Sequence, residues 1–247
     1  MKKFLIVLTV LHCLFMSIIS QASSLCEGMS INIGAMYTIK KSVLTSSEDV
    51  KETKQTSFQL WRKNNDTLHV NSTEKVSKQW HKLINGEVRK TDYFDHYQRG
   101  IEFEPKKITD IGWEQKNQLV SNEQLSKMKL IETTGKGCNR IEHYQLKNEQ
   151  ISMELWWLPE LTLAQKIVYI EQQYSTTWLL NEKIDSIAQI ENVFKKYENY
   201  EMTDFADIGD NESDPFLRKM IHLGFIEHGG SGFYDAEGHQ LSTNIHH

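Results

Sequence analysis

Short segments in which apolar and polar residues alternate dominate the chain beyond residue 30. In the first of them every second residue is apolar: Ile31, Ile33, Ala35, Tyr37 and Ile39. A period of two is typical of a strand that buries one face and leaves the other to polar surroundings. We therefore expect the chain to fold around a sheet with one apolar face.

Further short segments rich in β-branched and aromatic residues follow, with turn residues between them. Asn85-Gly86 is the pair that two-residue hairpins favour, because both residues tolerate positive φ. The polar residues 44–56 predict an exposed loop. The expected strands cover residues 57–63, 67–71, 77–84, 87–97, 101–104, 139–146, 151–158, 167–172 and 176–184. This succession predicts an antiparallel β-meander.

Three helices are expected. Ser121 and Gln124 form a capping box that predicts a helix near 121–130. Apolar residues at helical spacing predict a second helix over 186–200. In the third, Asp214 is the expected N-cap residue, and Pro215 suits the first helical position.

Together these segments predict an α+β fold with a curved, half-barrel-like antiparallel sheet, an inserted helix and a C-terminal helical and hairpin segment. We expect three parts: a signal peptide (1–22), an antiparallel β domain (26–184), and a C-terminal segment packed on the sheet (185–247).

The N-terminal residues predict export. Lys2 and Lys3 precede the apolar run 4–19, and Ser20-Gln21-Ala22 has small residues where a signal peptidase cleaves. An uncleaved anchor is the alternative, but the run is short for a membrane span and the chain turns polar directly after it. We therefore expect a periplasmic or secreted protein with no transmembrane anchor after cleavage.

The cysteine content and the net charge indicate the compartment and the kind of partner. Cys13 lies inside the expected signal peptide, which leaves Cys26 and Cys138. In an oxidising compartment a single disulfide between them is expected, with two free thiols as the alternative. Without the two signal lysines, 26 basic residues face 33 acidic ones, a net charge of about −7. With no basic cluster in the sequence, nucleic acid is not an expected partner.

Residues 150–184 have a distinctive order. A strand ends in Trp156-Trp157-Leu158-Pro159, and two further strands follow, the last of which carries Trp178. This order resembles the closing half of the LolA/LppX-like periplasmic lipoprotein carriers, and the resemblance extends over 31–184. It implies a curved sheet with an apolar concavity for acyl chains. No individual functional residue is carried over, and the last 60 or so residues lie outside the resemblance.

The C-terminal segment offers candidate metal ligands: His222, His228, Asp235 and His239. Imidazole and carboxylate groups suit a divalent transition metal such as Zn²⁺. Helix capping, turn chemistry and solvation explain the same residues without a metal. No other cofactor is expected. A Ser231, His228 and Asp235 triad would make the protein a hydrolase, but the nucleophile-elbow pattern is missing.

The tryptophans suggest a ligand-binding surface. Leu155 and Trp157 share the apolar face of one strand, while Trp156 must point to its other face, where we expect the C-terminal helices to cover it. The candidate ligand-binding residues are Leu155, Trp156, Trp157 and Trp178. The leading hypothesis is a non-enzymatic binding or chaperone protein for a lipid or a hydrophobic segment of another envelope protein. A metal-binding accessory protein and a hydrolase are the alternatives.

Overall fold

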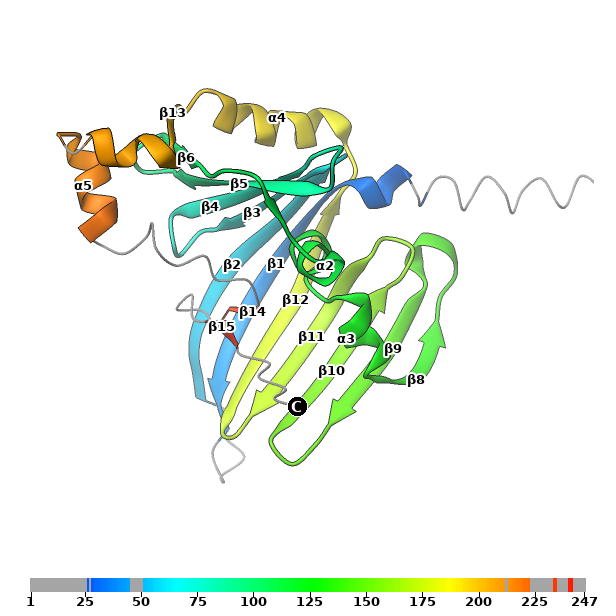
Figure 1. The fold of residues 1–247 in the computed structure, drawn as a ribbon. Helices are drawn as coiled ribbons and strands as arrows, with labels where there is room; N and C mark the ends of the chain where they lie inside the picture. The colour runs from blue at the N-terminus through cyan, green and yellow to red at the C-terminus, as the bar shows by residue number, and fades with distance from the viewer. Residues whose placement is uncertain are drawn as a thin grey trace, which may run out of the picture.

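The computed structural model describes residues 26, 28–44, 51–211, 213–222, 233–234 and 240–241. The expected signal peptide, residues 1–22, lies outside these ranges. Thirteen strands form a single curved sheet, in the order β13-β6-β5-β4-β3-β2-β1-β12-β11-β10-β9-β8, with β7 paired to β5 (Figure 1). Neighbouring strands run antiparallel except β13, which runs parallel to β6. Within the described chain the sheet stays unclosed, with β8 and β13 at its edges.

The sheet has two parts that the curvature turns toward each other. One part, which we call the floor, consists of β1 (Asn32–Val43), β2 (Lys51–Lys63), β8 (Lys129–Thr134), β9 (Ile141–Lys147), β10 (Ile151–Leu158), β11 (Leu163–Glu171) and β12 (Tyr174–Ile184). The remaining strands form or adjoin what we call the wall: β3 (Asp66–Asn71), β4 (Val76–Lys82), β5 (Glu87–Phe94), β6 (Arg99–Glu102), β7 (Lys106–Lys107) and β13 (Glu201–Asp204).

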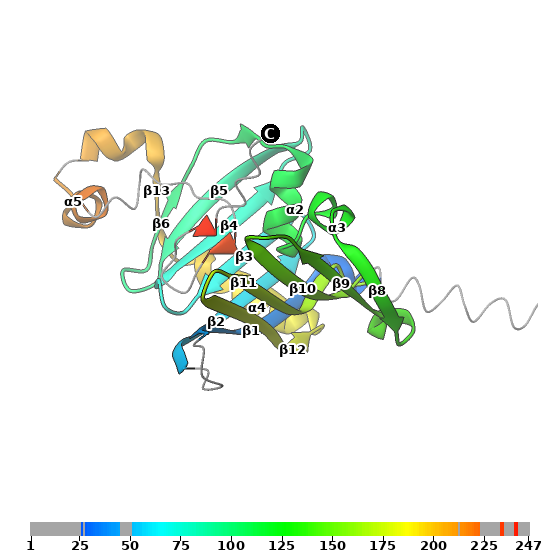
Figure 2. The same ribbon diagram turned by 90° about the horizontal axis from the view of Figure 1, so that it is seen from below.

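The helices cover different faces. Helices α2 (Asp110–Gln118) and α3 (Asn122–Ser126) lie on the inner side, and α2 occupies the angle between wall and floor (Figure 2). Helix α4 (Ile187–Glu198) lies on the outer side of the sheet (Figure 1). The other elements are η1 (Gly137–Asn139), η2 (Phe205–Asn211), α5 (Pro215–His222), β14 (Phe233–Tyr234) and β15 (Gln240–Leu241). None of the described helices is long and apolar enough to cross a membrane.

Three apolar clusters hold the layers together. The largest covers the inner face of the floor and includes Leu119, Val120 and Met128 from the α2–α3 region. A second joins α4 to the outer face through Trp61 and Tyr93. A third packs η2 and α5 against the far end of β4, β5 and β6. The sheet is therefore covered on both faces, but by different segments.

Many expected elements are confirmed. Ser121 and Gln124 form the predicted capping box at α3. Asp214 accepts hydrogen bonds from the backbone N–H groups of Phe216 (2.7 Å) and Leu217 (3.4 Å), as an N-cap residue should. The disulfide between Cys26 and Cys138 is present, with a Cα–Cα distance of 5.4 Å. The α+β class and the curved antiparallel sheet are as predicted, whereas the expected boundary at residue 185 stays a prediction.

Several local predictions were wrong. The expected loop 44–56 is shorter, because β2 begins at Lys51 and pairs with the full length of β1. Pairing across a long neighbouring strand outweighs the polar composition of this segment. Helix α2 and strand β8 were not predicted. Ile31 precedes β1 and is half exposed, so the buried alternation begins at Ile33.

Candidate functional site on the inner face of the sheet

The inner face of the floor is apolar across neighbouring strands. The period-two pattern of β1 places Ile33, Ala35 and Tyr37 there, and all three are buried. Leu155 of β10 lies opposite Ile167 of β11, which in turn lies opposite Trp178 of β12. Apolar side chains in register across three strands make a continuous hydrophobic surface.

Three of the four predicted ligand-binding residues lie together on this surface. Leu155, Trp157 and Trp178 are all buried in the inner cluster. The Trp178 ring packs edge-on against Phe58, at 5.2 Å between centroids, and against Tyr37, at 6.1 Å. The structure thus groups these three residues, and their role in ligand binding stays a prediction.

Trp156 lies on the outer face, apart from the other three. Its ring stacks on His143 at a centroid distance of 4.3 Å, and the Lys166 ammonium lies 4.5 Å from the ring centroid. The expectation that C-terminal helices cover Trp156 was wrong for the described helices. The buried side chains of α4 pack against Trp61 and its neighbours instead, and those of α5 against the far end of the wall.

A buried arginine fastens the tip of the β10–β11 hairpin to β2. The guanidinium of Arg62 donates hydrogen bonds to Thr162 Oγ1 and to the carbonyl of Leu161, both at 2.6 Å. Tyr37 donates to the carbonyl of Ala164 at 2.9 Å. Burial lowers the pKa of Arg62 to about 10. These bonds keep the hairpin tip against the inner face, where Leu161 and Leu163 are completely buried.

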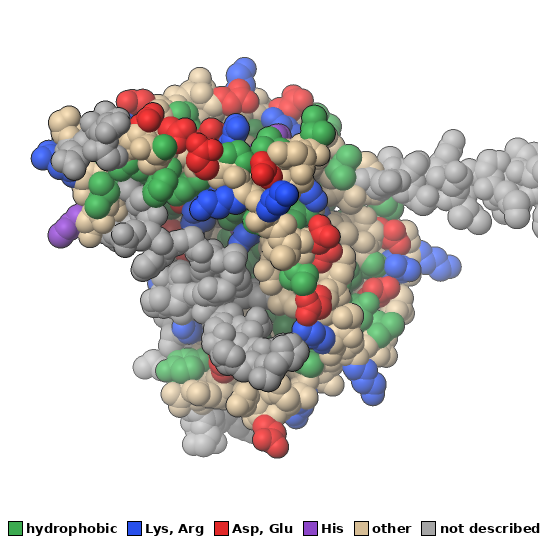
Figure 3. All heavy atoms as spheres, in the orientation of Figure 1, with side chains coloured by type: hydrophobic (Ala, Val, Ile, Leu, Met, Phe, Trp, Pro, Cys, Tyr) green, Lys and Arg blue, Asp and Glu red, His purple; other side chains and the backbone are tan. Residues whose placement is uncertain are grey.

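The inner face of the wall has a different chemistry. Alternation along β4 places Lys78, Trp80 and Lys82 on one face, and cross-strand pairing puts Lys90 opposite Trp80. Figure 3 shows Lys and Arg side chains, interspersed with acidic and hydrophobic ones, near the edge of β4 and β5 above α2. The ammonium of Lys82 lies 5.4 Å from the centroid of the Trp113 ring, and that of Lys90 lies 4.5 Å from Phe103.

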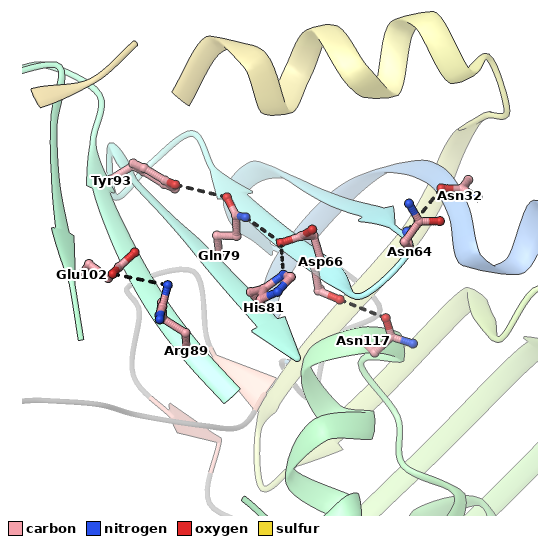
Figure 4. Close-up of polar contacts among 10 residues, drawn as sticks. Asn32, Asn64, Asp66, Gln79, His81, Arg89, Tyr93, Glu102 and Asn117 are labelled. Carbon is pink, nitrogen blue, oxygen red and sulfur yellow. Dashed lines mark hydrogen bonds and ion pairs between the residues drawn. The ribbon is translucent and has the colours of Figure 1, made fainter. Parts of the chain in front are cut away.

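Helix α2 adds a fourth lysine to this face. Its N-cap Thr109 accepts a hydrogen bond from the backbone N–H of Gly112 at 3.0 Å. At its other end, the carbonyl of Lys116 lies 2.7 Å from His69 Nε2, and Thr67 donates to Asn117 Oδ1 at 2.9 Å (Figure 4). These bonds to β3 hold α2 against the wall.

The same contacts bury ionisable groups. Lys116 is 8% exposed, and its ammonium lies 5.2 Å from the Trp80 ring centroid. Burial, reinforced by the charges of Lys78 and Lys90, lowers the pKa of Lys116 to about 8. Burial also lowers the pKa of His69 to about 3, so this imidazole is neutral at pH 7.

A polar cluster lies on the other face of the wall. Asp66 Oδ1 accepts a hydrogen bond from Gln79 Nε2 at 2.8 Å and lies 2.9 Å from His81 Nδ1 (Figure 4). Tyr93 donates to Gln79 Oε1 at 3.2 Å. This chain of contacts ties β3 to β4 and β5. In the hydrogen bonds of the described residues, His81 contacts Asp66 and no hydroxyl or thiol group that could act as a nucleophile.

The predicted metal site is not tested by the structure. His222 lies exposed at the end of α5, whereas His228, Asp235 and His239 lie outside the described residues. Ser231, the proposed hydrolase nucleophile, also lies outside them. In the part of the chain that the structure describes, no three His, Cys, Asp or Glu side chains form a group that could hold a metal ion.

Comparison with known proteins shows similarity of fold alone. No protein-family model matches the chain, and no curated protein matches it significantly in sequence. A solved structure of PNGF-II in space group P21 is 12% identical with a TM-score of 0.38, and the match covers 70% of this chain and 31% of that chain. A chain in the complex structure of Pseudomonas aeruginosa MucA/MucB is 8% identical with a TM-score of 0.30, covering 69% and 60%. A crystal structure of MucB is 10% identical with the same TM-score, covering 69% and 62%.

This chain therefore spans about a third of the PNGF-II chain and about three-fifths of the MucA/MucB and MucB chains that it matches. Likeness at these values carries no argument about function. The resemblance to the LolA/LppX-like carriers stays a prediction.

Proposed function

We propose that the protein is an exported, non-enzymatic binding protein that holds the acyl chain of a lipid against the inner face of the floor. The observation that carries this proposal is the continuous apolar surface on the inner side of an unclosed sheet. An acyl chain needs such a surface, since it offers no groups for hydrogen bonding. The disulfide between Cys26 and Cys138 supports an oxidising compartment.

The described residues that lie over the floor form a short segment with few buried apolar side chains. In the described part of the inner side, the α2–α3 region contributes Leu119, Val120 and Met128 to the buried cluster, and Leu125 is partly buried against it. Helix α3 itself has no buried residue. Few buried apolar contacts make a segment one of the easier parts of a fold to open locally. We propose that α3 moves aside when an acyl chain enters.

Quenching of tryptophan fluorescence by a brominated fatty acid tests this function. The adjacent tryptophans of β10 form a matched pair, because Trp157 lies in the inner cluster and Trp156 on the outer face. With 11-bromoundecanoate as the probe, we expect saturable quenching, since bromine quenches rings that it contacts. Trp157→Phe and Trp178→Phe should each reduce the fraction of the fluorescence that the probe quenches. In Trp156→Phe, the decrease in fluorescence intensity on adding the probe should be the same as in the wild type.

Absence of saturable quenching, or quenching that only Trp156→Phe removes, would contradict the proposal. Native mass spectrometry of the protein purified from periplasm without detergent provides a second readout. A bound lipid mass would agree with the proposal, whereas a bound peptide mass would make a hydrophobic segment of another protein the occupant instead.

A further inference from the structure

Four lysines and three aromatic rings meet on the inner face of the wall, beside the apolar floor. This group, which we call the lysine cluster, consists of Lys78, Lys82, Lys90 and Lys116 with Trp80, Trp113 and Phe103. Like charges that lie close together in a partly buried place repel one another, and this repulsion destabilises the folded protein. The arrangement therefore calls for a partner of opposite charge.

Lys116 is the most constrained member. The residue is more than nine-tenths buried, and among the described residues its ammonium has no hydrogen bond or ion pair and lies over the face of the Trp80 ring. An ammonium has three N–H donors, whereas an aromatic face supplies an electrostatic attraction and no lone pair for them. The neighbouring charges of Lys78 and Lys90 disfavour its protonated form further.

In the described part of the wall, a carboxylate pairs with one lysine of the cluster, Lys90. Asp92, which is 4% exposed, pairs with Lys90 at 2.8 Å through Oδ2, and its Oδ1 has no hydrogen-bond partner in the described part of the chain. Among the described residues no carboxylate lies within ion-pair distance of Lys82 or Lys116. Two ammonium groups beside α2, those of Lys82 and Lys116, therefore have no ion-pair partner among the described residues.

We propose that the lysine cluster binds an anionic group, a phosphate or a carboxylate, with Lys116 and Lys82 as its principal ligands. Oxygen atoms of such a group would accept the N–H bonds that the aromatic rings leave unmade. Resting on the function proposed above, the ligand is an anionic amphiphile whose head lies on the lysine cluster and whose chain lies on the floor. A free anion has the same head chemistry, and the experiment separates the two sources.

Calorimetric titration with three probes tests this inference: dodecyl phosphate, the neutral octaethylene glycol monododecyl ether, and inorganic phosphate, with both amphiphiles below their micelle concentrations. The variant is Lys116→Met, whose unbranched side chain is one atom shorter and carries no charge. Lys127→Met is the matched control, because Lys127 lies exposed next to α3 and pairs only with Glu123 in the described ion pairs. Lys82→Met is a second variant for use if Lys116→Met fails to fold.

We expect dodecyl phosphate to bind more tightly than the neutral amphiphile. Loss of one charge-assisted hydrogen bond should weaken dodecyl phosphate binding by about tenfold or more in Lys116→Met. Binding of the neutral amphiphile should not change, and Lys127→Met should bind all probes like the wild type.

The outcomes separate this inference from the proposed function. Equal affinity for both amphiphiles, or an equal loss for both in Lys116→Met, overturns the anion site and leaves acyl-chain binding in place. Binding of inorganic phosphate that depends on Lys116, without binding of either amphiphile, supports the anion site and contradicts the proposed function. No binding of any probe overturns both.

Discussion

Lys116→Met should stabilise the ligand-free protein, the opposite of what truncating a buried side chain usually does. Burial lowers the pKa of Lys116 from 10.5 to about 8. At about 1.4 kcal/mol for each pKa unit, the charged form is disfavoured by about 3 kcal/mol in the folded state. The attraction between the ammonium and the Trp80 ring offsets about 1 kcal/mol of this. A methionine, which packs well and carries no charge, should therefore raise the free energy of unfolding by about 2 kcal/mol at pH 7.

The pH dependence of this effect has a definite sign. Below about pH 8 both folded and unfolded chains carry the proton, so the full penalty is present. Between about pH 8 and 10.5 the folded protein has lost the proton while the unfolded chain still binds it, so the wild-type protein gains stability as the pH rises. Methionine does not titrate, and the advantage of the variant should shrink across this window.

Urea unfolding of both proteins at pH 7, 8, 9 and 10 measures the difference. Tyrosines of the unfolded chain titrate near pH 10, but they are common to both proteins, so their effect cancels in the comparison. A variant that is less stable than the wild type at pH 7, or a difference that stays constant from pH 8 to 10, would refute the reasoning. It would mean that an anionic group of the protein already neutralises Lys116.

Three further predictions concern the fold. Cys138→Ser opens a loop with a sequence separation of 112 residues and should lower the free energy of unfolding by up to about 5 kcal/mol on the loop-entropy estimate, as measured by urea unfolding against the oxidised wild type. Gly34→Ala should cost about 1–3 kcal/mol in the same assay, because the added Cβ would lie 2.4 Å from the Trp61 ring, whereas Gly28→Ala meets nothing within 4 Å and should be neutral. Asp214→Ala removes the N-cap of α5 and should lower the free energy of unfolding by about 0.5–2 kcal/mol. We expect faster amide hydrogen exchange in α5 and a lower urea midpoint.

The floor could be predicted from the sequence because its signal is local. Ile151, Met153, Leu155 and Trp157 alternate without interruption, and strands of this kind show which side chains share a face before the fold is known. The disulfide could also be predicted, since only two cysteines follow the expected signal peptide.

The lysine cluster could not be predicted from the sequence, because it depends on strand pairing and on a helix with no apolar stripe. Helix α2 reads Asp-Ile-Gly-Trp-Glu-Gln-Lys-Asn-Gln, and its one clear sequence signal is the N-cap Thr109 before an aspartate. Lys78, Trp80 and Lys82 do alternate along β4, but only the position of α2 brings Lys116 to them.

The wrong expectation that C-terminal helices cover Trp156 has a similar cause. The spacing of Ile190, Phe194 and Tyr197 predicts that α4 has an apolar face, and this is confirmed. Periodicity does not say which part of the sheet that face meets, and α4 packs near Trp61 rather than Trp156.

The bend of the sheet connects the two chemistries of its inner face. Register shifts interrupt β1 between Met36 and Tyr37 and between Lys41 and Ser42, and bulges of this kind increase bend and twist. Next to them Gly34 lets the Trp61 ring lie directly against the backbone on the outer side, where α4 covers it. The wall is turned so that its lysines and the apolar floor face the same interior, with α2 in the angle between them (Figure 2). A ligand with its head on the wall and its chain on the floor would cross this angle beside α2, which supplies Lys116 and is held to β3 by hydrogen bonds.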